Sequence, residues 1–529
     1  MPYRNKFLRL LSSAASLYLI RDEFTDTVAA GAVNGTAATP GPGARKVTDT
    51  NSKMSIGSDL LTTVTGGAAT GDPGLWYASL TRAAGRLCTA SLTYTSAIGF
   101  QIGFDSDQTA ASLYSINGSG TALRTTSNGG VAQVTVGAIA VSTTYKFAMI
   151  LRASGFAAFV KGGAFTNWTL VWLDTVSGST PLYPTISANS TTNAWSSDYF
   201  RVPRDLWLPV PLASDGFASS FGTTDGQGHA ETSGVGAGGD GKTWTHNTYS
   251  VSGGKAINTP STGSETIVNG TFAADTNWTK GGASPWTISG GVAVASAVSA
   301  AADLSQSVAP LTIGVWYRCS YDVSSFSAGT VRSVIGGNSS ATKAANGTYV
   351  EHNRAGSTAF SIRVGSALTA NIDNVSCLPL TLADLFASVS VSAADVFAGV
   401  DIVLANGTQA AGMVLCLDST GSPANFVVAY HDGTNANLVK CVAGTYTSVI
   451  ASAATYSAGA RLTVSKIGTA WRLYYNNALV SSGTISDAGI TSNTKHGLFN
   501  TYPTTNTLDN FAVYASGSGA NEHAQLDNY

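Results

Sequence analysis

The sequence predicts an all-β protein composed of tandem antiparallel β-sandwiches. Apolar and polar residues alternate with a period of two in many stretches, of which residues 145–160 and 461–480 are clear examples. Turn pairs such as Asp432-Gly433 separate these stretches, as expected of tight hairpins. No long helical period is present. Many short strands joined by regular turns are typical of β-sandwiches.

The composition agrees with this fold class and limits the functions open to the chain. Its 529 residues are enough for three or four domains. Charged residues supply only 11% of the sequence, less than half of the usual share of about 25%, so Ser, Thr, Asn and Gly must form much of the polar surface. Such surfaces suit extracellular β-proteins. A net charge of -2 offers no attraction to phosphate backbones or anionic membranes, which argues against nucleic-acid and membrane binding.

Residues 1–20 form a separate N-terminal segment with a basic start and a mildly apolar continuation. The apolar part, residues 10–20, is too short to span a bilayer and too rich in serine for the core of a signal peptide. We therefore expect a docking or anchoring role for this segment. No later segment approaches the length of a transmembrane helix, so no membrane span is predicted.

A weak internal repeat predicts two copies of one sandwich type. Residues 145–172 read as a strand, a short glycine turn and two further strands, and residues 461–485 follow the same order. A closing strand of similar form follows each copy, at residues 197–202 and 508–514. The second copy is interrupted, because a stretch as long as a domain separates its opening strands from its next matching strand, which begins at Leu385.

The predicted organisation therefore contains a split second domain. Such an insertion is physically reasonable, because jelly rolls have adjacent termini and hairpin tips tolerate inserted domains. The expected segments are an N-terminal docking segment (1–20), a first sandwich (21–203), a Pro-rich linker (204–213), a second sandwich split into 214–262 and 381–516, an inserted domain (263–380) and a polar C-terminal tail (517–529).

Both closing strands have the form Asp-x-Phe-x-Val, in residues 198–202 and in residues 509–513. This form is similar to the last strand of concanavalin A-like, laminin-G-like sandwiches, which returns beside the first strand. Residues 22–57 also resemble the opening of domains found in bacteriophage structural proteins. The resemblance implies two laminin-G-like jelly rolls in a protein of a phage tail, fibre or surface decoration.

The inserted domain resembles the galactose-binding-like jelly rolls of carbohydrate-binding modules, because it opens with the motif at residues 269–272 and closes with the motif at residues 372–375. The resemblance implies a sugar site, in which aromatic faces cover the C–H side of a sugar and polar side chains bind its hydroxyls. Core packing of the tryptophans is the alternative. The candidate carbohydrate-binding residues are Trp278, Trp286, Asn277, His352, Asn353 and Arg354.

Calcium is a further implication of this resemblance, because related jelly rolls often join their first and last strands through a bound ion. Asp275 and Asp373 are the matching candidates, and hard oxygen ligands suit Ca²⁺. A turn-capping role for Asp373 is equally compatible with the sequence, so both interpretations stay open.

Motifs that would indicate catalysis are weak. The six histidines are scattered singly, without a metal-binding spacing such as HExxH. Gly236, Gly241, Lys242 and Thr243 satisfy the GxxxxGK[ST] spacing of a phosphate-binding loop, but no strand precedes them and no helix follows. No pair of carboxylates is marked as a glycosidase site. We therefore expect a non-enzymatic protein.

Five cysteines are present, and none has a CxxC spacing. Buried free thiols are the simplest expectation. Cys319 with Cys377, and Cys416 with Cys441, fall within single proposed domains, so disulfides between these pairs remain possible.

Taken together, these features predict a virion structural or adhesive protein exposed on an extracellular particle. The expected partners are other virion proteins, further copies of the same chain and host-surface glycans, because multivalency makes a weak sugar contact useful. The alternative is a secreted bacterial carbohydrate-active enzyme or a cell-surface adhesin.

Overall fold

The computed structural model describes residues 18–39, 41–64, 74–94, 99–105, 112–119, 121–127, 132–153, 155–174, 182–188, 194–204, 206, 212–217, 242–282, 286–306, 308, 310–405, 410–501, 506–516 and 526. Most of the predicted docking segment, linker and tail, and the glycine-rich stretch up to Gly241, lie outside the described residues.

The regular secondary structure of the described residues is almost entirely β-strand. Their helices are one turn each: α1 (Ala488–Thr491) and the 3-10 helix η3 (Leu382–Leu385). The predicted fold class is confirmed, since the strands form tandem antiparallel sandwiches and the second sandwich is interrupted by a jelly roll. No helix in the described part of the chain is long and apolar enough to cross a membrane.

The first sandwich consists of two sheets. One contains, in spatial order, β13 (Phe165–Leu173), β12 (Phe156–Gly162), β11 (Thr144–Leu151), β6 (Leu87–Tyr94), β15 (Trp195–Ser197), β4 (Leu60–Thr63) and β3 (Met54–Gly57), with β1 (Tyr18–Asp22) and β16 (Phe200–Pro203) at its side. The other contains β10 (Ala132–Ala138), β9 (Ala122–Ser127), β8 (Ser112–Ser119), β7 (Phe100–Asp105), β14 (Tyr183–Ala188), β5 (Gly74–Trp76) and β2 (Lys46–Thr48).

The second sandwich draws its strands from two separated parts of the chain. One sheet contains β19 (Tyr249–Ser252), β20 (Lys255–Asn258), β39 (Thr507–Ala515), β30 (Val396–Val403), β35 (Arg461–Ile467), β36 (Ala470–Tyr475) and β37 (Ala478–Thr484), with β17 (Ala213–Asp215) beside β39. The other contains β18 (Thr245–His246), β29 (Phe386–Ser390), β38 (Lys495–Asn500), β31 (Ala411–Leu417), β32 (Phe426–His431), β33 (Asn435–Val442) and β34 (Thr445–Ala453).

The insert lies between β20 and η3 in the sequence. Its strands β25 (Trp316–Ile335) and β28 (Phe360–Pro379) each run for 20 residues and pair along most of their length. The remaining strands are β21 (Thr279–Lys280), β22 (Thr287–Ser289), β23 (Val292–Val298), β24 (Asp303–Gln306), β26 (Asn338–Ser339) and β27 (Gly347–Arg354).

The two closing strands return beside the first strands of their sandwiches. Asp22 of β1 pairs with Phe200 of β16, and Asp215 of β17 pairs with Phe511 of β39. Both aspartates also accept a hydrogen bond from the backbone amide two residues later, at 3.2 Å in the first sandwich and 2.7 Å in the second. The same local structure therefore opens both copies of the repeat.

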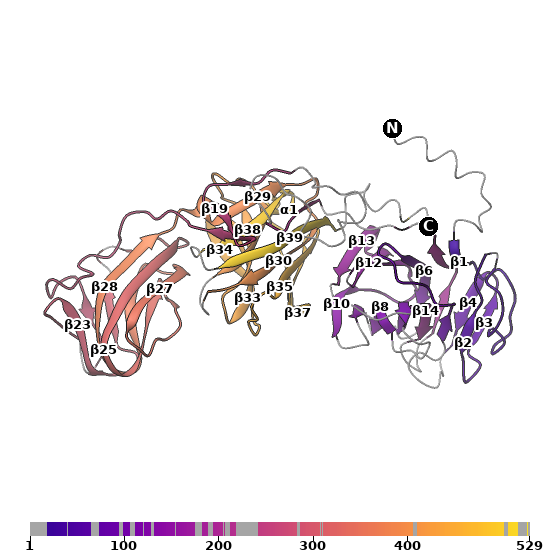
Figure 1. The fold of residues 1–529 in the computed structure, drawn as a ribbon, viewed down its shortest axis with the longest axis horizontal. Helices are drawn as coiled ribbons and strands as arrows, with labels where there is room; N and C mark the ends of the chain where they lie inside the picture. Colours follow the sequence, from indigo (N-terminus) through magenta and orange to yellow (C-terminus); the bar gives the residue numbers. More distant parts are fainter. Residues whose placement is uncertain are drawn as a thin grey trace.

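The three units follow one another in a row in Figure 1, with the insert at one end, the second sandwich in the middle and the first sandwich at the other end. Both sheets of the middle sandwich present apolar side chains on their outer faces. On one side, Trp172 of the first sandwich packs against Phe397 and Tyr474. On the other side, Trp316 of the insert packs against Phe499. The middle sandwich is therefore covered on both outer faces.

Of the two disulfides that the sequence left open, one forms. Cys319 of β25 and Cys377 of β28 occupy paired positions and form a disulfide. Cys88, Cys416 and Cys441 are buried free thiols, as expected, and no bridge joins Cys416 to Cys441. Adjacent strands bring the first pair together, a relationship that sequence separation alone does not reveal.

Candidate functional site

The tryptophans proposed for sugar stacking lie inside the insert. Trp278 is 8% exposed and Trp286 is 1% exposed, and both belong to the core of the jelly roll. Trp278 packs against Phe272 with ring centroids 5.1 Å apart, and its indole nitrogen donates to the carbonyl oxygen of Asn269 at 2.9 Å. Rings buried in this way present no face to a sugar, so the core-packing alternative is correct.

The proposed polar residues are separated into two groups. Asn277 lies in the turn before β21, at one end of the sheet order, whereas His352, Asn353 and Arg354 end β27. Strands β24, β28 and β25 lie between β21 and β27 in the pairing scheme. Asn277 therefore does not join the other three residues.

The proposed calcium ligands have other partners. Asp275 forms an ion pair with Lys280 at 2.5 Å, and Asp373 accepts a hydrogen bond from the backbone amide of Asn374 at 2.7 Å. Within the described residues, no group of three or more His, Cys, Asp or Glu side chains is arranged to hold a metal ion. The geometry favours the turn-capping interpretation of Asp373.

A pocket of about 310 Å³ lies where the insert meets the second sandwich. One wall comes from β25, β26 and β27 of the insert, and the other from the hairpin between β32 and β33. Volumes from about 300 Å³ upwards are typical of small-molecule sites. The lining residues are Trp316, Ser339, Ser340, Ala341, His352, Asn353, Ala410, Tyr430, Asp432, Thr434 and Asn435.

Trp316 and Tyr430 supply large apolar surfaces to this pocket. Trp316 of the insert meets Tyr430 of the second sandwich edge to face, with ring centroids 6.0 Å apart. Burial raises the pKa of Tyr430 to about 12, so its hydroxyl stays protonated at neutral pH and can donate a hydrogen bond. The two rings hold the two walls together.

The hairpin tip is fixed by Asp432. Its Oδ1 accepts hydrogen bonds from the backbone amides of Thr434 at 2.9 Å and Asn435 at 2.7 Å, and its Oδ2 accepts one from the Asn437 side chain at 2.9 Å. The following residue, Gly433, has a φ of 92°, a conformation that favours glycine. The turn predicted at Asp432-Gly433 is therefore confirmed, and it places a rigid carboxylate in the pocket wall.

Several polar side chains in the wall are available to a ligand. Among the described residues, the Nδ2 atom of Asn353, the side-chain amide of Asn435 and the hydroxyl of Thr434 make no hydrogen bond. Asn353 and Asn435 lie on opposite walls. Amide groups that both donate and accept hydrogen bonds suit the hydroxyls of a sugar.

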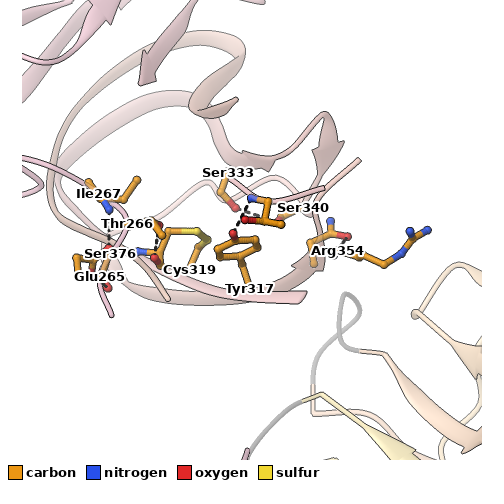
Figure 2. Close-up of a disulfide and its surroundings, with 12 residues drawn as sticks. Glu265, Thr266, Ile267, Tyr317, Cys319, Ser333, Ser340, Arg354 and Ser376 are labelled. Carbon is orange, nitrogen blue, oxygen red and sulfur yellow. Dashed lines mark hydrogen bonds between the residues drawn. A yellow bond between two sulfur atoms is a disulfide. The ribbon is translucent and has the colours of Figure 1, made fainter. Parts of the chain in front are cut away.

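Arg354, the third predicted residue of β27, lies outside the lining of the pocket. Its guanidinium stacks on Tyr446 of the second sandwich, 4.3 Å from the ring centroid. Figure 2 shows this side chain extending from the insert, apart from the disulfide and Glu265 on the other side of Tyr317. Arg354 therefore helps to hold the two units together and does not reach into the pocket.

A second place with interacting carboxylates occurs on the middle sandwich. Asp401 and Asp509 are paired on neighbouring strands, and Arg461 binds Asp401 at 2.8 Å. Burial raises the pKa of Asp509 above its usual range. Two neighbouring carboxyl groups with different pKa values are a feature of glycosidases. However, the cavity beside Arg461 has a volume of only about 10 Å³, which is too small for a sugar.

Sequence reasoning missed Trp316, Tyr430, Asp432 and Asn435. No motif marks them, because they come from two units that are distant in the sequence. The one useful signal was the Asp432-Gly433 pair, which located the hairpin but not its neighbour in space.

The similarity of this chain to known proteins is limited to distant matches with solved structures. No protein-family model matches the sequence, and no curated protein matches it. Among solved structures, the carbohydrate-binding module CBM66 from Bacillus subtilis has a TM-score of 0.21 and 17% identity, covering 24% of this chain and 81% of the module. The endo-beta-1,3(4)-glucanase SCLam has a TM-score of 0.25 and 11% identity, covering 36% of this chain and 92% of that enzyme. No activity is transferred from them.

Proposed function

We propose that this chain is a non-catalytic, glycan-binding surface protein and that the pocket between the insert and the second sandwich holds the sugar. The observation that carries the proposal is the composition of that pocket. Aromatic rings, amides, hydroxyls and one carboxylate converge there from two sheets. Sugar recognition needs this combination, because a sugar has both C–H surface and hydroxyl groups.

The contacts define a role for each wall. Tyr430, which is partly exposed, covers apolar C–H groups and donates its hydroxyl to an oxygen, while the buried Trp316 holds the Tyr430 ring in place. The amides of Asn353 and Asn435 bind hydroxyls from opposite sides. A ligand held by both walls would bridge the insert and the sandwich.

The non-catalytic part of the proposal is supported by the other carboxylates. Many of them have structural partners, as in the pairs Asp303 with Arg363, Asp395 with Lys466 and Asp487 with Lys440. A glycosidase requires two carboxylates facing a ligand-sized space. Among the described residues, Asp432 is the carboxylate that lines the junction pocket, and Asp401 and Asp509 line neither this pocket nor the small cavity beside Arg461.

The proposed setting is the surface of a phage-type particle, in which the chain acts as a homo-oligomer beside other virion proteins. This rests on the resemblance of residues 22–57 to phage structural domains and on the low charge of the sequence. Three units packed in a row suit a rigid spacer that holds a sugar site away from a particle. Several copies would compensate for the weakness of one contact.

A glycan array with the full chain tests the proposal. Binding is expected for the natural sequence and should be lost in the double variant Asn353→Ala/Asn435→Ala, whereas Asn167→Ala, at an exposed position of β13, should leave it unchanged. Release of reducing sugar from polysaccharides would favour the secreted-enzyme alternative. Absence of the chain from purified virions would contradict the proposed setting.

A further inference from the structure

We propose that the junction pocket selects uncharged sugars over acidic ones and that Asp432 sets this preference. The inference rests on the proposed function, because it concerns the ligand class of the same pocket. Its basis is the charge and the hydrogen-bonding capacity of the lining residues.

Among the described residues that line the pocket, none is Lys or Arg. Recognition of a sugar carboxylate requires a cation or several directed donors, since an anion that loses its water without such partners is strongly destabilised. Arg354 directly follows the lining residue Asn353 on β27, but its guanidinium is held on the ring of Tyr446. An acidic sugar would therefore enter without a lysine or arginine as its counter-charge.

Asp432 adds a repulsive contribution. Its carboxylate is part of the wall and already accepts three hydrogen bonds from the chain. A carboxylate offers about four acceptor positions, so about one remains for a ligand. A neutral hydroxyl can donate to it, whereas a second carboxylate would be repelled, which is a device for specificity.

Matched sugar pairs test this preference in the full chain. We would measure binding at pH 7 and low ionic strength by titration calorimetry or saturation-transfer NMR, with methyl β-D-glucopyranoside against methyl β-D-glucuronide and methyl β-D-galactopyranoside against its galacturonide. The members of each pair differ only in oxidation at C6. In at least one pair the neutral member should bind about tenfold or more tightly than the acid, which corresponds to about 1.4 kcal/mol.

Two variants separate Asp432 from general effects. Asp432→Asn keeps an oxygen for the two amides of the hairpin tip but removes the charge, and it should reduce the discrimination severalfold. Asp418→Asn is the matched control, because Asp418 accepts hydrogen bonds from Ala424, Asn425 and Ser419 in another turn of the same sheet, and it should leave the discrimination unchanged. If Asp432→Asn does not fold, added salt should weaken the discrimination of the natural chain by screening.

The outcomes distinguish the two proposals. Equal or tighter binding of the acids, lost in Asn353→Ala/Asn435→Ala, overturns the charge preference and leaves the glycan pocket standing. If Asp432→Asn folds and still prefers neutral sugars to the same extent, the role of Asp432 is overturned. If Asp432→Asn does not fold, the role is overturned when added salt fails to weaken the preference of the natural chain. Absence of binding to all four sugars, or binding that the double variant does not affect, overturns both proposals.

Discussion

Trp172 of the first sandwich meets Tyr474 of the second with ring centroids 4.8 Å apart and ring planes inclined by 60°. The Tyr474 hydroxyl also donates to the carbonyl oxygen of Thr135 at 3.3 Å. Beside them, the backbone amide of Leu170 donates to the carbonyl oxygen of Ser516 at 3.0 Å. The Ser516 hydroxyl donates to the carbonyl oxygen of Leu170 at 3.1 Å. These contacts join two domains of the same type into one continuous apolar cluster.

Trp172→Ala should uncouple the two sandwiches. Large-to-small changes at buried aromatic positions cost about 3 to 5 kcal/mol, and here the loss falls on the contact between domains. Thermal unfolding should change from a common transition to separate ones, and small-angle scattering should show a broader distribution of lengths. Trp172→Phe should have a smaller effect. An unchanged melting profile of Trp172→Ala would contradict the proposed coupling.

Trp316→Ala should detach the insert from the middle sandwich. Trp316 is 4% exposed and packs against Phe499 and Tyr430, so its removal takes away aromatic contacts that join the insert to the middle sandwich. Sugar binding should be lost, because the two walls of the pocket separate. Ile313→Ala is a suitable control, since Ile313 lies just before the same strand and is 61% exposed. Retained binding in Trp316→Ala would show that the site does not need both units.

Arg45→Met should destabilise the first sandwich more than a surface substitution. The Arg45 side chain is fully buried and donates to Asp22 at 2.6 Å and to Asp26 at 2.6 Å, and Tyr77 donates to Asp22 at 2.9 Å. Removal of the arginine leaves a buried carboxylate without its cation, at a cost of about 3 to 5 kcal/mol. Urea unfolding measures this loss, which Arg45→Lys should reduce only in part because lysine lacks the bidentate geometry.

His496 should make the middle sandwich sensitive to mild acid. Its Nδ1 accepts a hydrogen bond from the Cys416 amide at 3.3 Å and its Nε2 lies 3.2 Å from the Ala393 carbonyl oxygen, so the ring is neutral with its proton on Nε2. Burial lowers the pKa of His496 to about 4. The unfolded chain binds a proton below pH ~6.5 and the folded chain does not, so stability falls as the pH drops from about 6.5 to about 4.

The free energy of unfolding that His496 removes should reach about 3 kcal/mol near pH 4, the acid end of this pH range. Chemical unfolding at pH 7, 5.5 and 4.5 measures it. His431, whose pKa is also lowered by burial, contributes in the same direction. His496→Gln should flatten the pH dependence, and an equally steep dependence in that variant would assign the effect to other groups.

Period-two patterning was sufficient to predict the strands and the fold class, because alternation of apolar residues reports which face of a strand is buried. The two Asp-x-Phe-x-Val closing strands were predicted from the internal repeat and from the resemblance to laminin-G-like sandwiches. Patterning did not predict whether Trp278 and Asn353 belong to a core or to a sugar site. Both residue types occur in cores and in sugar sites, and only the neighbours of a side chain decide between these roles.

The sequence by itself determined that this chain forms β-sandwiches, one of them split by a jelly roll. Only the tertiary structure decided that the insert covers the middle sandwich and brings Asn353 opposite Asn435. The physical reason is the distance along the chain over which each interaction acts. Local alternation specifies strands through neighbouring residues, whereas docking of Trp316 on Tyr430 depends on surfaces that exist only after each unit has folded.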